Sequence, residues 1–196
     1  MSLRVGGGLL KGRVLAAPRG EHCRPLAGRL KQSLFDYLGE TVREAAVLDL
    51  FAGVGVFGVE ALSRGAARAT FVEDDAGLVD ALEENLRSLG LTDASRTYCE
   101  DVFAYFETTR PSTPYDVVFL DPPYGRGLAF RAVERLATWA GFGEGSLGIS
   151  KTFKKERFAG PAPLTLLDVR QLGDDNLSFF GKVRSNRAAG FGGKVS

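Results

Sequence analysis

Apolar residues follow two spacings along this chain, one typical of helices and the other of buried strands. Leucines recur at every fourth position from Leu26 to Leu38, with Pro25 suited to the first turn of a helix and Gly39 to its end. Short apolar runs bounded by glycine or charged residues predict strands. The predicted helices cover residues 25–39, a segment that follows the glycines after 51 and ends near 65, residues 76–90, a short segment after 101, and about 128–139. The predicted strands cover residues 47–51, 69–72, 96–99, 115–120, 147–150, 164–170 and 176–183.

The order of these elements predicts the class of fold. Strands and helices alternate from residue 47 to residue 150, which is typical of a mostly parallel sheet with helices on both faces. The last two strands are joined by LGDD without a helix, so we expect an antiparallel hairpin at one edge. Residues 3–19 pair two short apolar runs around glycines. We therefore expect an α/β, Rossmann-like chain with a seven-stranded sheet and a small basic N-terminal β-hairpin extension.

Size and composition favour one globular domain. The chain has 196 residues, of which 44% are hydrophobic and 25% charged. No apolar run approaches the roughly 20 residues that cross a bilayer, and the first residues lack a signal-peptide core, so we expect a cytoplasmic monomer. We expect a basic arm over residues 1–23, a main domain over 24–183 and a disordered basic tail over 184–196.

The formal net charge of +1 conceals a segregation of charge. Residues 1–35 carry seven Lys or Arg against one Glu, and the chain from residue 182 adds four basic residues and no acid. The stretch between them holds 14 basic and 23 acidic residues. A Gly-rich segment with this excess of cations favours a polyanionic partner such as RNA, although a solvated surface also fits. The candidate phosphate contacts are Arg4, Lys11, Arg13, Arg24 and Arg29.

Metal chemistry has few candidate ligands in this sequence. The chain has two cysteines and one histidine, which are Cys23, Cys99 and His22. Cys99 falls in a strand that we expect to lie in the core. Two cysteines support neither a disulfide framework nor a Cys-based zinc site. We therefore expect two inert thiols, a surface imidazole and no metal centre.

The stretch LDLFAGVGVFG places a glycine loop between a predicted strand and a predicted helix. Gly53, Gly55 and Gly58 have the G-x-G-x-x-G spacing, and Glu73 closes the next strand 20 residues after Gly53. Glycines let the backbone approach a ligand, and an acid at that distance can hold ribose hydroxyls. The pattern favours a nucleoside-containing cofactor, and the alternative is a tight turn without a ligand.

Acidic residues near this loop indicate which cofactor it takes. Asp49, Glu73, Asp74, Asp75 and Asp101 lie near strand ends, so we expect them at the carboxyl edge of the sheet, where ligands bind. Negative charge there would repel the pyrophosphate of NAD, which a helix N-terminus alone would favour. It suits S-adenosylmethionine (SAM), which carries a sulfonium and an ammonium group against one carboxylate. Asp74 and Asp75 would also serve as helix-capping or turn residues.

The stretch FLDPPYG ends a buried strand with an acid, two prolines and an aromatic ring. Prolines have no N–H to donate, so Pro122 and Pro123 stop the ladder and keep Asp121 outside the helical region. A group with two N–H donors could give one to the Asp121 carboxylate and the other to the Pro122 carbonyl, while Tyr124 stacks on a flat ring. Taken alone, the motif also fits a turn with an exposed tyrosine.

Together, DLFAGVGVFG, FVEDD and DPPY resemble the class I SAM-dependent amino-methyltransferases, in which an Asp, Asn or Ser followed by two prolines and an aromatic residue faces an exocyclic amine. More narrowly, RVGGGLLKGRVLAAP, RPLAGRLKQSLFDYLG, VLDLFAGVGVFGVEALSRGA and DVVFLDPPYGRG resemble the RsmD family, which methylates guanine N2 in small-subunit (16S) ribosomal RNA. The resemblance runs from about Arg4 to Gly127 and, more weakly, to Val183. It implies a class I methyltransferase fold, SAM as cofactor, and ribosomal RNA or the small ribosomal subunit as partner.

The resemblance also implies roles for individual positions. The methionine end of SAM would lie on Asp49, Phe51, Ala52, Gly53 and Gly55. The ribose would lie on Glu73 beside Asp74, the adenine on Asp101 and Val102, and the target guanine on Asp121, Pro122, Pro123 and Tyr124. Three positions depart from the family pattern. Leu26 stands in place of a usual Thr, Val54 in place of a usual Ser, and Lys151 where an acid is common.

Other functions stay open at this point. A DNA adenine-N6 methyltransferase would use the same D-P-P-Y geometry, but the short chain has no obvious domain for reading the major groove. A dehydrogenase would need NAD on the glycine loop. A non-catalytic RNA-binding or assembly protein would keep the fold without the activity.

Overall fold

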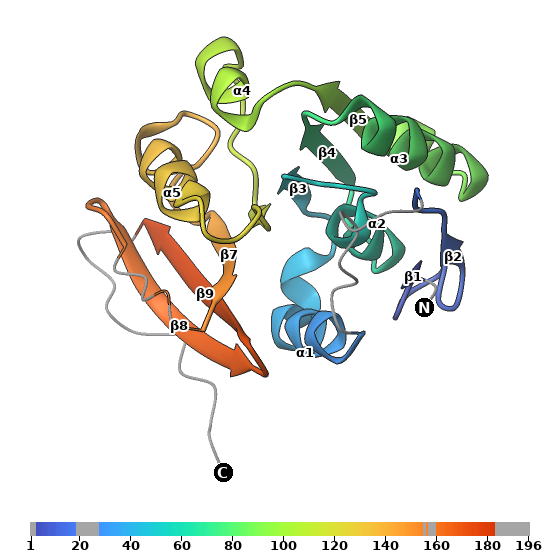
Figure 1. Cartoon of the computed structure of the whole chain (residues 1–196), viewed down its shortest axis with the longest axis horizontal. Helices are drawn as coiled ribbons and strands as arrows, with labels where there is room; N and C mark the ends of the chain where they lie inside the picture. The colour runs from blue at the N-terminus through green and yellow to red at the C-terminus, as the bar shows by residue number, and fades with distance from the viewer. Residues whose placement is uncertain (1–2, 19–27, 155, 157–159, 183–196) are drawn as a thin grey trace.

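The computed structural model describes residues 3–18, 28–154, 156 and 160–182. Each strand predicted above is present in these residues, with ends that differ by a few positions. In chain order the elements are β1 (Leu3–Arg4), β2 (Val14–Leu15), α1 (Gly28–Leu38), the 3-10 helix η1 (Gly39–Val42), β3 (Ala46–Leu50), α2 (Val56–Ser63), β4 (Arg68–Glu73), α3 (Ala76–Ser88), the 3-10 helix η2 (Thr92–Ala94), β5 (Ser95–Cys99), α4 (Val102–Thr108), β6 (Val117–Leu120), α5 (Leu128–Thr138), β7 (Leu147–Phe153), β8 (Leu164–Leu172) and β9 (Asp175–Lys182) (Figure 1).

Seven strands form one sheet in the order β5-β4-β3-β6-β7-β9-β8. The first five of these are parallel, and β9 lies antiparallel between β7 and β8. The chain order reverses between β3 and β6, and in open α/β sheets ligands bind at the carboxyl ends of the strands at such a point. The predicted mostly parallel sheet with an antiparallel hairpin at one edge is confirmed.

Helices cover both faces of the sheet (Figure 1). Helices α1, α2 and α3 pack on one face, where Phe57 and Leu82 join Phe119 of β6 in one core. Helices α4 and α5 pack on the other face. The side chains directly before and after Phe119 in β6 point toward that face. This division follows from the strand geometry, because successive side chains point to opposite faces of a sheet.

The N-terminal hairpin packs against α2 and α3. Strands β1 and β2 pair antiparallel, as predicted, and the side chain of Leu15 is buried in the first core. The Leu9 N–H donates to the carbonyl of Ser63, the last residue of α2, at 2.8 Å. The Asn85 amide of α3 accepts the N–H of Ala16 at 2.7 Å and donates to its carbonyl at 3.0 Å. The tip of the hairpin thus lies beside the last residue of α2, while Asn85 also donates to the Val54 carbonyl of the glycine loop at 3.3 Å and so links Ala16 to that loop.

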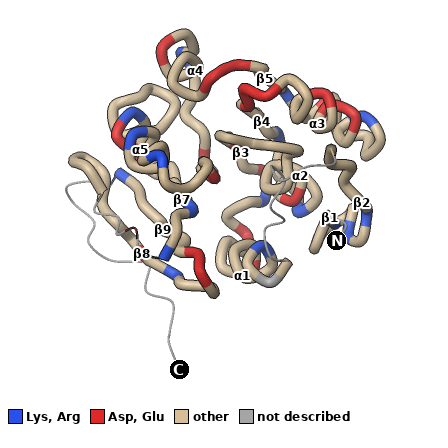
Figure 2. The backbone as a smooth tube through the Cα atoms, in the orientation of Figure 1, with Lys and Arg blue, Asp and Glu red and all other residues tan. Residues whose placement is uncertain are grey.

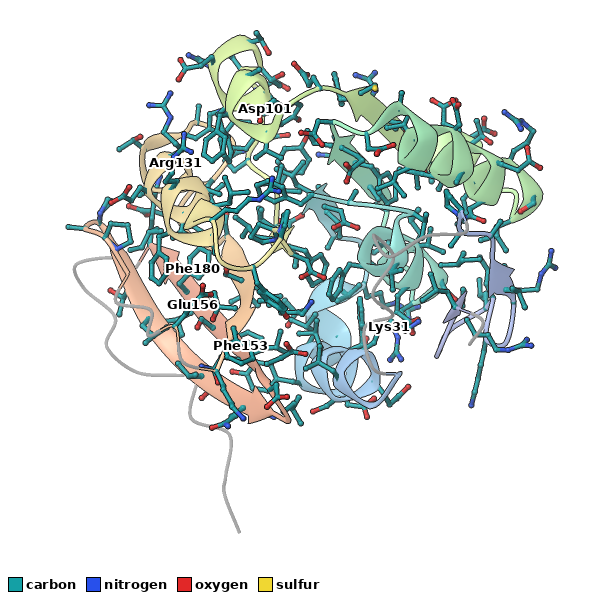
Figure 3. The ribbon with its side chains drawn as sticks, viewed as in Figure 1. Lys31, Asp101, Arg131, Phe153, Glu156 and Phe180 are labelled. Carbon is teal, nitrogen blue, oxygen red and sulfur yellow. The ribbon has the colours of Figure 1, made fainter. Side chains whose placement is uncertain are left out.

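A buried carboxylate joins the hairpin to α1 and α2. Glu60 of α2 has no exposed surface and accepts the Gly6 N–H at 2.7 Å. Its oxygens also pair with Lys31 of α1 and with Arg64, each at 2.8 Å (Figure 3 labels Lys31). Burial works to raise the pKa of Glu60, but the Gly6 N–H and the two cations hold that pKa below its ordinary value. Glu60 is therefore ionised at neutral pH.

Three findings concern cysteine, metal and membrane. Cys99 is exposed, so the expectation of a core position was wrong, because β5 forms one edge of the sheet. Cys23 and His22 lie outside the described residues. Within the part of the chain that the structure describes, no group of three or more His, Cys, Asp or Glu is arranged to hold a metal ion, and no helix is long and apolar enough to cross a membrane.

Candidate active site

The glycine loop lies at the carboxyl end of β3 and leads into α2. Phe51, Gly53 and Gly55 have φ values of 60°, 57° and 82°. A positive φ is easy for glycine but costs about 1–3 kcal/mol at a residue such as Phe51, and such strain is common at functional sites. A Cβ at Gly55 would lie 2.4 Å from Leu82, whereas a Cβ at Gly53 would meet no atom within 4 Å. The loop therefore packs on the core at Gly55 and borders open space at Gly53.

Asp49 is fully buried on β3, next to the loop. Its Oδ2 accepts the Gly58 N–H at 2.9 Å, whereas its Oδ1 has no hydrogen-bond partner among the described residues. Burial raises the pKa of Asp49 well above its ordinary value; the Gly58 N–H opposes this rise, and the charges of Asp121 and Glu73 add to it. A buried polar atom without a partner is costly unless a water or a ligand satisfies it. Asp49 is thus suited to a ligand group with positive charge.

Glu73 ends β4 beside the loop and is nearly buried. Its Oε2 accepts the Gly53 N–H at 2.7 Å, and its Oε1 accepts the N–H groups of Asp74 and Asp75 at 3.1 Å each. Burial raises the pKa of Glu73, and the backbone donors oppose that rise. Because a carboxylate offers about four acceptor sites, three of these bonds leave one for a ribose hydroxyl. The ribose contact of Glu73 stays a prediction.

Two of the acids near the sheet edge cap helices. Asp75 accepts two N–H groups in the first turn of α3 at 2.8 and 3.0 Å, so its alternative role as a cap is observed. Asp101 accepts two N–H groups in the first turn of α4 at 2.8 and 3.1 Å (Figure 3). Asp74 is exposed and Val102 is buried. Acidic residues thus follow both β4 and β5 (Figure 2). The adenine contacts of Asp101 and Val102 stay predictions.

The D-P-P-Y corner lies at the carboxyl end of β6, which is the neighbour of β3 at the reversal of strand order. The Asp121 side chain is 23% exposed. Pro122 is buried, Pro123 is exposed, and Tyr124 is half-buried with its hydroxyl donating to Asp175 of β9. The alternative of a turn with an exposed tyrosine does not fit this half-buried, hydrogen-bonded ring. The structure therefore brings the corner and the glycine loop to the same edge of the sheet.

Lys151 of β7 is part of this corner. Its Nζ lies 2.6 Å from Asp121 Oδ1 and 5.0 Å from the centroid of the Tyr124 ring. Burial raises the pKa of Asp121, whereas Lys151 lowers it and Asp175 adds to the rise. Sequence reasoning noted Lys151 only as a departure from a family pattern and missed Asp175. The sequence signal that bore on Asp175 was the predicted β8–β9 hairpin. That prediction did not say whether β9 pairs with β7.

The predicted RNA-binding residues are only partly described. Arg4, Lys11 and Arg13 are exposed on the hairpin (Figure 2 shows its basic positions). Arg4 donates to the Gly12 carbonyl at 3.0 Å, and Arg13 donates to the carbonyl at the end of α3 at 3.3 Å. Arg24 and the side chain of Arg29 lie outside what the structure describes. The hairpin thus gathers three of the five predicted cations.

Comparison with known proteins identifies the family. The family model described as conserved hypothetical protein 95 matches residues 3–181. Ribosomal RNA small subunit methyltransferase D of Escherichia coli is 37% identical over 134 residues, which make up 68% of this chain and 66%, just under two thirds, of that protein. The protein of the same name from Haemophilus influenzae is 32% identical over 172 residues, or 87% of this chain and 89% of that protein. The chain belongs to the RsmD family.

Solved structures agree with membership of the RsmD family. The Escherichia coli protein yhhF, described as a candidate methyltransferase, has a TM-score of 0.82 at 30% identity and covers 93% of this chain and 98% of its own. A hypothetical protein from Thermus thermophilus has a TM-score of 0.76 at 31% identity, covering 90% of this chain and 97% of its own. The family and the methyltransferase fold that the sequence motifs implied are confirmed.

Proposed function

We propose that this protein transfers a methyl group from SAM to small-subunit ribosomal RNA, and that N2 of a guanine is the acceptor atom. Membership of the RsmD family supports the enzyme class, the cofactor and the RNA substrate. One observation extends the proposal to individual atoms: the D-P-P-Y corner and the glycine loop end neighbouring strands at the reversal of strand order. A ribosomal substrate also agrees with the expected cytoplasmic location.

The residues around the glycine loop fit SAM. The unpartnered Asp49 Oδ1 offers an acceptor to a cationic group, and the open side of Gly53 leaves room beside the loop backbone. Bound SAM supplies an electrophilic methyl group on a cationic sulfur, whose charge nearby carboxylates stabilise. The residues proposed to hold SAM are Asp49, Phe51, Ala52, Gly53, Gly55, Glu73, Asp74, Asp101 and Val102.

The acceptor side contributes alignment and charge stabilisation. The lone pair of guanine N2 is delocalised into the ring, so this amine is a poor nucleophile. Asp121 and the Pro122 carbonyl would each accept one N–H of the amine, turning its lone pair toward the methyl group and stabilising positive charge on the nitrogen. Pro123 stiffens this backbone, Tyr124 stacks on the base, and Asp121 or solvent takes the proton. Because N2 faces the minor groove of a duplex, the base must be unpaired or flipped first.

The hairpin supports a large substrate. Arg4, Lys11 and Arg13 would contact phosphates, and Arg24 and Arg29 would add to them. Leu9, at the tip of the hairpin, donates to the last residue of α2, a helix whose eight residues span about 12 Å. Phosphates on the hairpin therefore belong to nucleotides other than the target, which favours an extended RNA over a free nucleoside.

Transfer of labelled methyl from SAM tests the proposal, with small ribosomal subunits, naked 16S RNA and duplex DNA as acceptors. RNA or subunits from a strain that lacks this protein should accept label, and digestion to nucleosides should place it on guanine N2. Label on DNA adenine alone would favour the DNA methyltransferase, and RNA binding without transfer would favour the non-catalytic protein. Label on another RNA atom would overturn the assignment to N2.

Asp121→Ala tests the acceptor role within the same assay. We expect transfer to be abolished while the affinity for S-adenosylhomocysteine stays within a few-fold of wild type, because Asp121 is assigned to the acceptor side. Asp174→Ala is the matched control, since Asp174 is an exposed acid in the β8–β9 turn and should leave both quantities unchanged. Comparable loss of transfer and cofactor affinity in Asp121→Ala would mean that the assigned role is wrong.

A further inference from the structure

Lys151 donates a hydrogen bond to Asp121, the carboxylate that is proposed to bind the amine of the target base. Its Nζ lies 2.6 Å from Asp121 Oδ1, and its side chain is only 10% exposed. Among residues 3–18, 28–154, 156 and 160–182, no other side chain or backbone N–H donates to this carboxylate. The ammonium therefore makes the kind of hydrogen bond that an incoming amine would make, and it leaves Oδ2 to that amine.

Three strands hold Lys151 in this place. The residue lies on β7, and its ammonium sits over the Tyr124 ring that follows β6. The Tyr124 hydroxyl is fixed by Asp175 of β9. Phe153, two residues after Lys151 on the same side of β7, places its ring centroid 6.2 Å from that of Tyr124 (Figure 3 labels Phe153). The lysine is thus built into the corner and is not a surface cation that has met an acid.

Besides Lys151, an acid on a neighbouring strand acts on Asp121. The charge of Asp175 on β9 reaches Asp121 through space, and the charge of Asp121 in turn acts on Asp49 of β3. Burial and Asp175 favour the protonated form of Asp121. A protonated carboxyl donates through one oxygen and is a poorer acceptor for an amine. Without a cation, the corner would tend to lose the form that the proposed reaction needs.

We propose that Lys151 is a positioning residue for methyl transfer: its ammonium holds Asp121 ionised and aimed before the acceptor amine arrives, and then shares the carboxylate with that amine. The inference rests on the proposed function and deepens it. It also gives a physical reason for a lysine here, because a buried carboxylate with Asp175 nearby needs a counter-charge to stay ionised.

Lys151→Met provides the test, since methionine removes the charge and keeps much of the length of the side chain. The acid limb of kcat/KM against pH reports ionisation of an essential group in the free enzyme. Loss of an opposite charge within about 4–6 Å raises a carboxylate pKa by about 1–3 units. The acid limb of Lys151→Met should therefore move to higher pH by about 1–3 units, with activity recovering as the pH rises.

Two further variants separate the charge from the shape of the side chain. Lys151→Arg keeps the charge, so its acid limb should stay at the wild-type pH even if the different geometry lowers the rate. Lys154→Met makes the same chemical change in an exposed pair with Asp174, and its limb and rate should match wild type. Melting temperature and S-adenosylhomocysteine affinity establish that each variant is folded.

A second measurement needs no RNA. Carbon-13 NMR titration of the Asp121 carboxyl should show the same rise of its pKa in Lys151→Met. Suppose that the wild-type protein transfers methyl, but that Lys151→Met changes neither the pH of the acid limb of kcat/KM nor the pKa of Asp121 in the NMR titration. This inference alone is then overturned. Faster transfer at every pH would also overturn it, because Lys151 would then be an obstruction. If the wild-type protein modifies no ribosomal RNA, the proposed function itself fails.

Discussion

Replacing Glu60 by Gln should destabilise the fold, because the change removes the negative charge from the buried network that joins the hairpin, α1 and α2. Lys31 and Arg64 lose their counter-charge, while the Gly6 N–H keeps an amide oxygen to which it can donate. Removing one partner of a buried ion pair costs about 3–5 kcal/mol. Lys31 still donates to the Arg4 carbonyl, and the Arg64 side chain is 19% exposed, so we expect the lower end, about 3 kcal/mol.

This loss should depend on pH with a defined sign. The pKa of Glu60 in the folded chain lies below its ordinary value of 4.5, which applies to the unfolded chain. A group whose folded pKa is lowered contributes stability above its unfolded pKa and loses it as the pH falls through the folded value. The difference in the free energy of unfolding between wild type and Glu60→Gln should therefore be full at pH 7 and shrink below about pH 4.5.

Urea unfolding followed by circular dichroism measures this difference, and calorimetry should show a Tm lower by roughly 6–12 °C for a chain of this size. Glu84→Gln is the matched control on α3, because Glu84 and Arg87 form a pair whose side chains are 60% and 65% exposed. Exposed pairs contribute about 0–1 kcal/mol. If Glu60→Gln costs no more than Glu84→Gln, the buried network does not stabilise this fold and the reasoning is refuted.

Three shorter predictions concern the core and the hairpin. Gly58→Ala should lower the free energy of unfolding by about 1–3 kcal/mol in urea, because its Cβ would lie 2.2 Å from the Phe71 ring; an unchanged midpoint would mean that the ring yields without cost. Asn85→Ala should cost about 1–3 kcal/mol and speed hydrogen exchange of the Ala16 amide, which loses its acceptor; unaltered exchange would contradict this. Lys11→Ala should reduce the slope of log affinity for RNA against log salt by about 0.7–0.9 in fluorescence anisotropy, and an unchanged slope would place Lys11 outside the interface.

Local patterns predicted most of the elements because burial fixes the pattern of apolar residues. The described leucines of the four-residue repeat, Leu30, Leu34 and Leu38, are all buried along one side of α1. Strand β6 reads as a continuous apolar run because helices cover both faces of the sheet where it lies. The glycine loop and the D-P-P-Y corner were visible for a related reason, since glycine allows backbone conformations that other residues rarely adopt and proline restricts them.

Contacts between distant segments could not be predicted in this way. The pair of Lys151 with Asp121 and the bond of Tyr124 to Asp175 depend on which strands become neighbours and in what register. The same is true of Glu60, whose partner Lys31 lies on another helix. Cys99 was misplaced for this reason too, because the order of the strands, which local patterns do not give, puts β5 at the edge of the sheet.

The position of β9 has a consequence for how the protein is made. This strand follows β8 in the chain, yet it inserts between β7 and β8, and its Asp175 anchors Tyr124. A nascent polypeptide emerges from the ribosome N-terminus first. The edge of β7 that pairs with β9 therefore stays unpaired until residues 175–182 have left the exit tunnel. The part of the site assigned to the nucleobase is thus completed only after β9 has been synthesised, later than the part assigned to the cofactor.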